Sequence, residues 1–482
     1  MSDATTIMLP DGSELDLSDL TEDELLELYQ SYEKHLANSL TSVGTLVGGG
    51  FTSTLDSCLG PTTWQTMQVA AKLFSLCLIL RVVTLVNIPT KMKHFVSCLT
   101  GIATFVIFFG EHSMLYHLLT LCGAGYMLIF IAAKHKGGVV SLFCVAFLLT
   151  CEVVVVASED WNPVKGTFMV LSMKIISFSF DVEKGVIAEF PDILAYSGYV
   201  LCPSSIIFGP FMMYKDYCQI LQHRPMTLTW FLSLVRSILL GYIFLILSSC
   251  ICPWIFPEES NKWLIAYQTA MSFRCSNYFI GFLSESSCLL CGIGTVVKED
   301  KEEKIEWKVP VSRPQHVEFP RSFVEIAIHW SVPNHIFLKN YVFKKARGLG
   351  PFLSMFVTFA ASSILHGLSF QIAAVLVSIA TYAYVEHAFR KKLSRVFSMC
   401  IEARKCKPDC THQFKESNYW VTVINLAFGF LNIFHLAYLG VMFDGNNSGR
   451  GYGVEHTLEK WSELNYTSHW IVLGIYLVSA VL

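Results

Sequence analysis

No Asp, Glu, Lys or Arg interrupts the chain from Gly348 to Val385, and this charge-free run constrains the fold more than any other feature. A single helix over the run would be roughly 57 Å long, whereas the hydrocarbon core of a bilayer is only ~30 Å thick. The run therefore predicts two membrane-embedded helices joined by a turn.

His366 stands inside this run and is the only titratable residue between Arg347 and Tyr382. An ionisable group at membrane depth is costly to place, and such groups usually serve a reaction or a transport path. The alternative interpretation is a core histidine that is hydrogen-bonded to a neighbouring helix.

The rest of the chain is also apolar. Of its 482 residues, 53% are hydrophobic and only 15% are charged, whereas soluble domains carry ~25% charged residues. This composition excludes a soluble enzyme and predicts an all-α, polytopic transmembrane helical bundle with about 9–11 spans plus re-entrant segments. Spans are predicted at 64–87, 95–112, 114–133, 137–157, 193–213, 228–252, 350–365, 367–389, 419–442 and 468–482, with weaker signals at 165–180, 262–293 and 321–343.

The N-terminal segment differs from this membrane part. Residues 1–40 hold ten acidic residues and one lysine, and they lack the apolar region of a cleavable signal peptide. Leu17 to Leu36 could form an acidic surface helix. We therefore predict an acidic segment at 1–58, cytosolic or at the surface, and a membrane domain at 59–482.

Two charge and modification signals predict the orientation of the C-terminal part. The basic loop that contains Arg390, Lys391, Lys392 and Arg404 is expected in the cytosol. Asn446 and Asn465 begin glycosylation acceptor sequences, which are useful only on the luminal side. One predicted helix, 419–442, separates the two loops, so the signals agree and the C-terminus is expected to return to the cytosol.

The same basic loop contains Cys406, Cys410 and His412. Their spacing resembles half of a metal site, but no second pair of ligands follows at the spacing typical of zinc. We therefore expect no metal, and a local disulfide or free thiols instead.

Unusual polar features are concentrated between 317 and 366. Pro333 predicts a local break after Trp330-Ser-Val, because the residue before a proline disfavours the helical conformation. Irregular backbone is tolerated inside a membrane protein where it lines a cavity. The segment therefore predicts a polar pocket close to His366.

Several short motifs in the chain resemble the membrane-bound O-acyltransferase family, and together they cover residues from about 60 to the end. The motifs are Phe180-Asp-Val-Glu-Lys-Gly, Phe208-Gly-Pro, Ser276-Asn-Tyr-Phe-Ile-Gly-Phe, Val317-Glu-Phe-Pro-Arg-Ser, Asn340-Tyr-Val-Phe-Lys, Ile364-Leu-His-Gly-Leu-Ser-Phe, Tyr384-Val-Glu-His, His435-Leu-Ala-Tyr-Leu-Gly and Lys460-Trp-Ser-Glu-Leu. The resemblance implies a catalytic histidine, which maps onto His366.

The resemblance also implies an upstream polar partner, an Asn or Asp in a Trp-Asn-x-Pro context. Ser331 occupies that position here, which departs from the family pattern. Serine can hydrogen-bond a substrate or a water, but with one donor and a shorter reach than asparagine. Asn334 or Asn340 could take the role instead.

The expected chemistry agrees with these residues. An apolar setting favours the neutral imidazole, which is the form that a general base needs, and such bases contribute about 10²–10⁴-fold to the rate. We expect a substrate serine to attack the thioester directly, with His366 as its base and then as proton donor to the CoA thiolate. The rival is a cysteine acyl-enzyme, but the sequence pairs no particular cysteine with His366.

The resemblance is to the branch that acylates Wnt proteins, and it implies palmitoleoyl-CoA as co-substrate, a Wnt serine as acceptor and the endoplasmic reticulum membrane as location. No separate cofactor and no nucleic-acid partner are expected. Residues predicted to contact substrate are Arg274, Asn277, Tyr278, Trp330 and Tyr341. Ordinary helix packing is the alternative for these side chains. Basic residues near the interface, among them Lys344, Lys345 and Arg347, could bind CoA phosphates.

Two other functions are kept open. A lysophospholipid acyltransferase of the same family would take a lipid acceptor through a lateral gate. A polytopic transporter would instead have an uninterrupted water path through the bundle.

Overall fold

A computed structural model describes residues 6–8, 14–16 and 51–482, except 111, 133, 258, 300–301, 408 and 445–452. The chain divides into two compact units, Met1–Pro61 and Thr62–Leu482. The first contains an antiparallel hairpin of β1 (Thr6–Met8) and β2 (Glu14–Asp16), in which Thr6 pairs with Asp16. The predicted acidic helix at Leu17–Leu36 lies outside the described residues.

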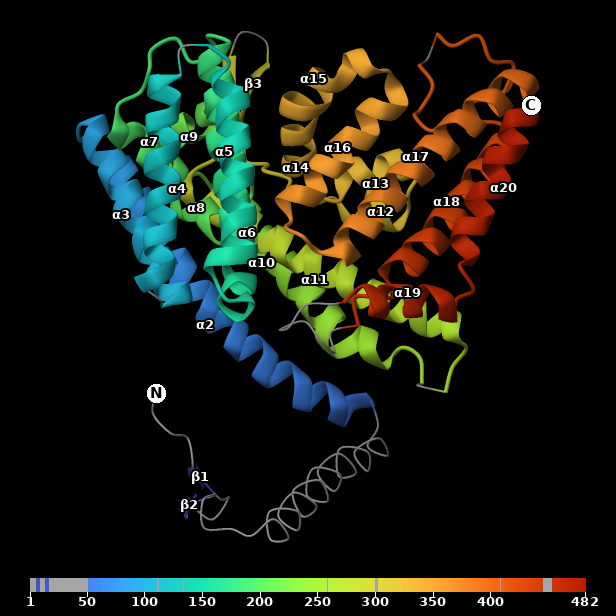
Figure 1. The fold of residues 1–482 in the computed structure, drawn as a ribbon, viewed down its shortest axis with the longest axis horizontal. Helices are drawn as coiled ribbons and strands as arrows, with labels where there is room; N and C mark the ends of the chain where they lie inside the picture. The colour runs from blue at the N-terminus through green and yellow to red at the C-terminus, as the bar shows by residue number, and fades with distance from the viewer. Residues whose placement is uncertain are drawn as a thin grey trace. The chain divides into compact units, whose positions relative to one another are not determined.

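Helices make up most of the second unit (Figure 1). The first helices are α2 (Phe51–Leu85), α3 (Thr90–Phe109), α4 (His112–Ile131), α5 (Lys136–Thr150) with its π-helical continuation η3 (Cys151–Val155), α6 (Ser158–Glu183), α7 (Ile193–Val200), α8 (Pro203–Ile206) and α9 (Tyr214–Ile220). The middle of the chain forms α10 (Leu228–Ile246), η4 (Leu247–Ile251), η5 (Cys252–Trp254), α11 (Lys262–Cys291) and a hairpin of β3 (Thr295–Glu299) and β4 (Glu302–Glu306).

The last part of the chain begins with short helices and ends with long ones. The short ones are α12 (Pro314–Glu318), α13 (Phe323–His329), α14 (Val332–Phe337), the π-helical η6 (Leu338–Phe343), α15 (Lys344–Ala346) and η7 (Arg347–Leu349). They are followed by α16 (Pro351–Leu365), α17 (Phe370–Phe397), α18 (Tyr419–Gly440), α19 (Val454–Glu463) and α20 (Thr467–Val481). The charge-free run thus forms two helices, α16 and α17, with His366 in the turn between them.

The predicted class, a helical membrane protein, is confirmed. Among the described residues, 7 helices are long and apolar enough to cross a membrane, or up to 8 if α19 and α20, which are bent by 73°, form one span. This count is lower than the predicted one. The long helix α6 carries six charged residues, and every side chain from Val170 to Phe180 is buried. A helix that is buried on all sides faces protein rather than lipid, so it does not need a lipid-compatible surface.

The predicted span at 193–213 is wrong. The chain there forms α7 and α8, two short helices separated at Cys202. Pro203 begins α8, and a proline has no N–H with which to continue the hydrogen bonds of the preceding helix. The predicted break before Pro333 is confirmed, because α13 ends at His329 and α14 begins at Val332.

The long helix α11 connects the two sides of the second unit. It packs against α10 and α8 on one side and against α18 on the other, and it crosses below α16 and α17 in the view of Figure 1. Some buried cations donate to backbone carbonyls. The Lys174 ammonium, for example, donates to the carbonyl of Val200 (2.9 Å) and to the Ser205 hydroxyl (2.9 Å), and thereby ties α6 to α7 and α8.

Candidate active site

His366 caps the C-terminal end of α16 and is followed at once by Gly367, whose φ is +90°. A glycine reaches this left-handed region without the steric cost that a side chain would bring. Ser369 then caps α17, where its hydroxyl accepts a hydrogen bond from the N–H of Ile372 (3.4 Å). The histidine therefore stands on a short turn that is fixed at both ends.

The carboxylate of Glu152, in η3, holds this turn from the neighbouring span. It accepts a hydrogen bond from the Leu368 N–H at 2.9 Å. A Cβ added at Gly367 would lie 2.5 Å from Oε1 of Glu152, so the turn requires glycine for space as well as for φ. Sequence reasoning missed Glu152. The sequence does mark this residue, because a carboxylate inside a predicted membrane span is as unusual as the histidine itself.

The imidazole of His366 differs from the buried histidines elsewhere in the chain. Within the described residues its ring makes no hydrogen bond, and it is partly buried. By contrast, Nδ1 of His435 lies 2.6 Å from the Ser468 hydroxyl, and Nδ1 of His94 lies 2.9 Å from the Tyr217 hydroxyl. Those two are core histidines with hydrogen-bond partners. Within the described residues, both ring nitrogens of His366 lack a hydrogen-bond partner from the protein.

The polar segment that contains Ser331 continues into η6, which packs against α16, the helix that ends at His366. Ser331 is the N-cap residue of α14, but its side chain makes no capping hydrogen bond. Asn340 accepts a hydrogen bond from the Lys344 ammonium at 2.8 Å. Within the described residues no hydrogen bond joins His366 to Ser331, Asn334 or Asn340. The upstream partner stays a prediction.

Two histidines lie on either side of Ser331. Burial lowers the pKa of His329, whose Nδ1 is 2.9 Å from the Glu325 carbonyl. Burial also lowers the pKa of His335, and the cation of Lys339 lowers it further. For both rings burial therefore favours the neutral imidazole over the charged form.

Arg274 and Tyr278, predicted to contact substrate, share a protein partner. The guanidinium of Arg274 makes two hydrogen bonds to the Glu318 carboxylate, at 2.8 and 3.0 Å, and the Tyr278 hydroxyl donates to the same carboxylate at 2.7 Å. This cluster joins α11 to α12. Asn277 donates to the Phe273 carbonyl within its own helix (3.1 Å).

The two predicted aromatic contacts are also engaged. The ring of Trp330 stacks on Phe273 with centroids 6.2 Å apart. The hydroxyl of Tyr341 lies 3.0 Å from each Asp181 carboxylate oxygen, and its ring stacks on Phe180 at 5.9 Å. These contacts join η6 to the end of α6. Substrate binding by these residues stays a prediction.

Two small cavities among the described residues are not lined by His366. One is lined by Ala70, Ser237 and Phe279, among others, and another by Glu386, Asn432 and His435. The polar pocket predicted close to His366 stays a prediction.

The family follows from comparison with known proteins. Residues 139–406 match the membrane-bound O-acyltransferase family. The chain therefore belongs to this family, and the turn with His366 lies inside the matched region.

Individual relatives extend the similarity to most of the chain. Protein-serine O-palmitoleoyltransferase porcupine from Homo sapiens is 37% identical over 452 residues, which cover 89% of this chain and 97% of the human protein. The protein of the same name from Anopheles gambiae is 33% identical over 88% of this chain and 92% of its own length. Lysophospholipid acyltransferase 2 from Arabidopsis thaliana is 24% identical over 58% of this chain and 70% of its own length.

Proposed function

We propose that this protein transfers a palmitoleoyl group from palmitoleoyl-CoA to a serine hydroxyl of a Wnt protein, in the membrane of the endoplasmic reticulum. The observation that carries the proposal is the similarity to protein-serine O-palmitoleoyltransferases, which extends over 89% of this chain and 97% of the human relative. The similarity to lysophospholipid acyltransferases is weaker and covers 58% of this chain. A protein acceptor is therefore favoured over a lipid acceptor.

His366 is the group proposed to move protons. As the serine oxygen attacks the thioester carbonyl, the neutral imidazole takes the hydroxyl proton, which makes the oxygen a better nucleophile. The carbon–sulfur bond then breaks, and the imidazolium returns the proton to the CoA thiolate. The free ring nitrogens and the rigid turn around His366 support this role. Glu152 is a positioning residue in the proposal, because it touches the turn and not the reacting atoms.

A cationic cluster beside Tyr341 is a candidate site for the CoA phosphates. The ammonium of Lys184 lies 5.5 Å from the Tyr341 ring centroid, and that of Lys345 lies 5.0 Å from the Phe180 ring centroid. Lysines from α6 and α15, far apart in sequence, thus meet over one aromatic pair. Their charges would attract phosphate groups. Lys345 was among the basic residues that the sequence suggested, and Lys184 was not.

The acceptor is tested with purified protein in lipid nanodiscs, supplied with labelled palmitoleoyl-CoA and either a Wnt-derived hairpin peptide or a lysophospholipid. Label on the peptide serine is the expected result. Label on the lysophospholipid alone would overturn the proposal in favour of the lipid acceptor. Flux of a solute without any acyl transfer would favour a transporter.

His366→Ala should lower acyl transfer to the peptide by at least about 10²-fold, because the general base is lost. The protein should still be extracted as a monodisperse species with an unchanged melting temperature. His135→Asn is the matched control. His135 is exposed and has a φ of 59°, a conformation that asparagine also tolerates. If the His366→Ala variant unfolds to the same extent as it loses activity, His366 is a structural residue instead.

A further inference from the structure

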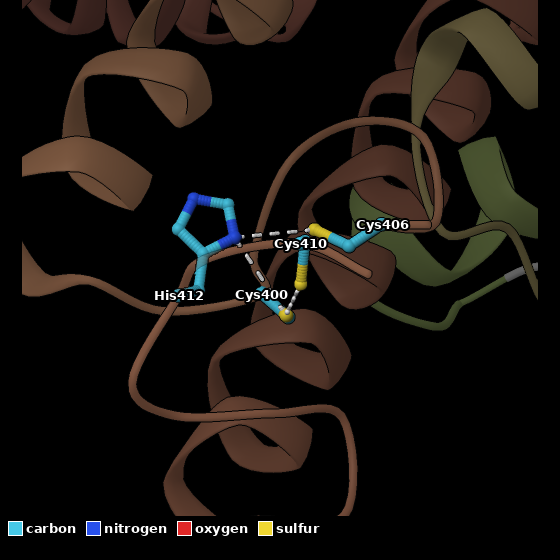
Figure 2. A group of neighbouring side chains, drawn as sticks. All are labelled: Cys400, Cys406, Cys410 and His412. Atoms are coloured by element: carbon cyan, nitrogen blue, oxygen red, sulfur yellow. Dashed lines mark hydrogen bonds between the residues drawn. The ribbon is translucent and has the colours of Figure 1, made fainter. Parts of the chain in front are cut away.

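Three cysteines and a histidine meet in the loop between α17 and α18, far from His366 in sequence. Figure 2 shows Cys400, Cys406 and Cys410 with their sulfur atoms gathered at one side of the His412 ring. The potential ligand atoms of these four residues all lie within 4.8 Å of one another. The spacing of Cys406, Cys410 and His412 alone was too incomplete to predict a site. Cys400 supplies the fourth group.

The distances match those between the ligands of a tetrahedral zinc ion. Nδ1 of His412 lies 3.7 Å from Sγ of Cys400 and 3.6 Å from Sγ of Cys406. In a tetrahedron with normal Zn–S and Zn–N bonds, sulfur and nitrogen are about 3.6 Å apart and two sulfurs about 3.8 Å apart. Sγ of Cys400 and Sγ of Cys410 are 3.4 Å apart, slightly closer than this, and too far apart for a disulfide bond.

A neighbouring hydroxyl fixes the protonation of His412 in the form that a metal requires. The Ser394 hydroxyl donates its proton to the Met399 carbonyl (2.6 Å), so it accepts from Nε2 of His412, 2.9 Å away. Nε2 must then carry the ring hydrogen, and Nδ1 keeps its lone pair toward the three sulfurs. Metal-binding histidines are oriented in the same way by a hydrogen bond to the other ring nitrogen.

The surroundings suit an anionic metal centre. Three thiolates around Zn²⁺ leave a net charge of −1, and Arg404, Lys405 and Lys407 lie in the same loop. The Lys415 ammonium also donates to Sγ of Cys410 at 3.2 Å. All three cysteines are free thiols, as they would be in a reducing compartment such as the cytosol, where the basic loop is predicted to lie.

We propose that Cys400, Cys406, Cys410 and His412 bind one zinc ion. With four protein ligands the site is closed, which is the arrangement of a structural zinc rather than a catalytic one. Binding releases the thiol protons and links the start of the loop, at Cys400, to its later part, at His412. The proposal does not depend on the acyl acceptor.

The zinc-bound loop would hold in place two arginines, Arg390, which is buried, and Arg321, which is partly buried. The Cys400 carbonyl accepts a hydrogen bond from Arg321 (2.9 Å), and the next carbonyl, that of Ile401, accepts one from Arg390 (2.7 Å). Arg390 is fully buried, and it also pairs with Glu386 of its own helix (2.9 Å). A disordered loop would remove these acceptors and leave the buried guanidinium of Arg390 with fewer partners, which is destabilising even though Glu386 remains.

Metal analysis tests the proposal directly. The protein is purified without metal-affinity resin, and zinc is measured per chain by mass spectrometry. About one zinc per chain is expected for the wild type. Cys406→Ser should lower this content at least about tenfold. Cys218→Ser, a partly buried free cysteine outside the loop, is the control and should keep the wild-type content.

A second variant keeps the test decisive if the ligand variant does not fold. Ser394→Ala retains all four ligands and should weaken zinc binding about 10–100-fold, measured by competition with a chromogenic chelator. Wild-type protein without bound zinc that does not take up added zinc would overturn the proposal. A disulfide between Cys400 and Cys410 in protein purified under reducing conditions would also overturn it.

Discussion

Ser331 occupies the position where the family resemblance implies an asparagine, and it is the residue at which this chain departs most clearly from the pattern. Its hydroxyl makes no capping bond to α14, so it is available to a substrate or a water. Asn340, by contrast, already accepts the Lys344 ammonium. At the scale of single residues, Ser331 is therefore the better candidate for the partner of His366.

Ser331→Ala should lower the turnover of peptide acylation by about tenfold, the size of effect expected for one lost hydrogen bond in the transition state. Asn340→Ala should cause a smaller loss. The measurement is kcat with saturating palmitoleoyl-CoA. If Ser331→Ala is fully active and Asn334→Ala is not, the partner role belongs to Asn334.

Glu152→Ala should lower turnover by up to about 10²-fold, because the turn that carries His366 loses its acceptor and a small displacement of a catalytic group is costly. Glu152→Gln should restore most of the activity, since the amide oxygen can accept the same Leu368 N–H. Glu189→Ala, at an exposed site, is the control. A full loss in Glu152→Gln as well would mean that the charge, and not the hydrogen bond, matters.

At the scale of helices, the Arg274–Glu318 pair joins α11 to α12, while substrate contact by Arg274 stays a prediction. Only 2% of Arg274 is exposed, and one of its nitrogens, Nη1, is buried with no hydrogen-bond partner among the residues that the structure describes. The carboxylate of Glu318 thus offsets most of the cost of burying the guanidinium, and it fixes α12 on α11. The sequence indicated Arg274 because a charge among apolar residues stands out, but its partner lies on a different helix.

Glu318→Gln should destabilise the protein by about 3–5 kcal/mol, because it leaves a buried arginine without its counter-charge. Glu306→Gln is the control, since Glu306 pairs with Lys308 at the surface (3.2 Å), where ion pairs contribute at most about 1 kcal/mol. Thermal unfolding in detergent, followed by intrinsic fluorescence, measures both. Equal melting temperatures for the two variants would contradict a structural role for the Arg274–Glu318 pair.

The sequence predicted the helices that face lipid better than those that face protein. The apolar runs at 95–112 and 419–442 correspond to α3 and α18 within a few residues. The charged residues of α6 made the predicted helix shorter than the observed one. The hydrogen bonds from Lys174 to α7 and α8, which allow its charge to be buried, cannot be read from the order of residues in the chain. The sequence likewise singles out both His366 and Glu152 as polar groups within apolar runs, but it does not show that Glu152 accepts a hydrogen bond from the turn that carries His366.

At the scale of the whole membrane unit, a contact between α17 and α20 brings the basic loop close to the C-terminus. The ammonium of Lys392, in α17, donates to the carbonyl of Ser479, near the end of α20. Asn465 lies just before α20, in a turn with a φ of 54°, at the opposite end of that helix. The structure thus places the C-terminus beside the basic loop and Asn465 away from it, as the orientation predicted from the sequence requires.

This arrangement predicts that Asn446 and Asn465 face the lumen and that the basic loop and the C-terminus face the cytosol. Asn465→Gln, combined with Asn446→Gln, should abolish any shift in gel mobility caused by glycosidase, because both acceptors are expected in the lumen. In cells whose plasma membrane alone is permeabilised, an epitope inserted after Leu482 should be accessible to antibody, since the C-terminus shares the side of the cytosolic basic loop. An epitope that becomes accessible only after full permeabilisation would reverse the orientation. It would also place the three thiols of the proposed zinc site in an oxidising compartment, where a disulfide would be favoured over zinc.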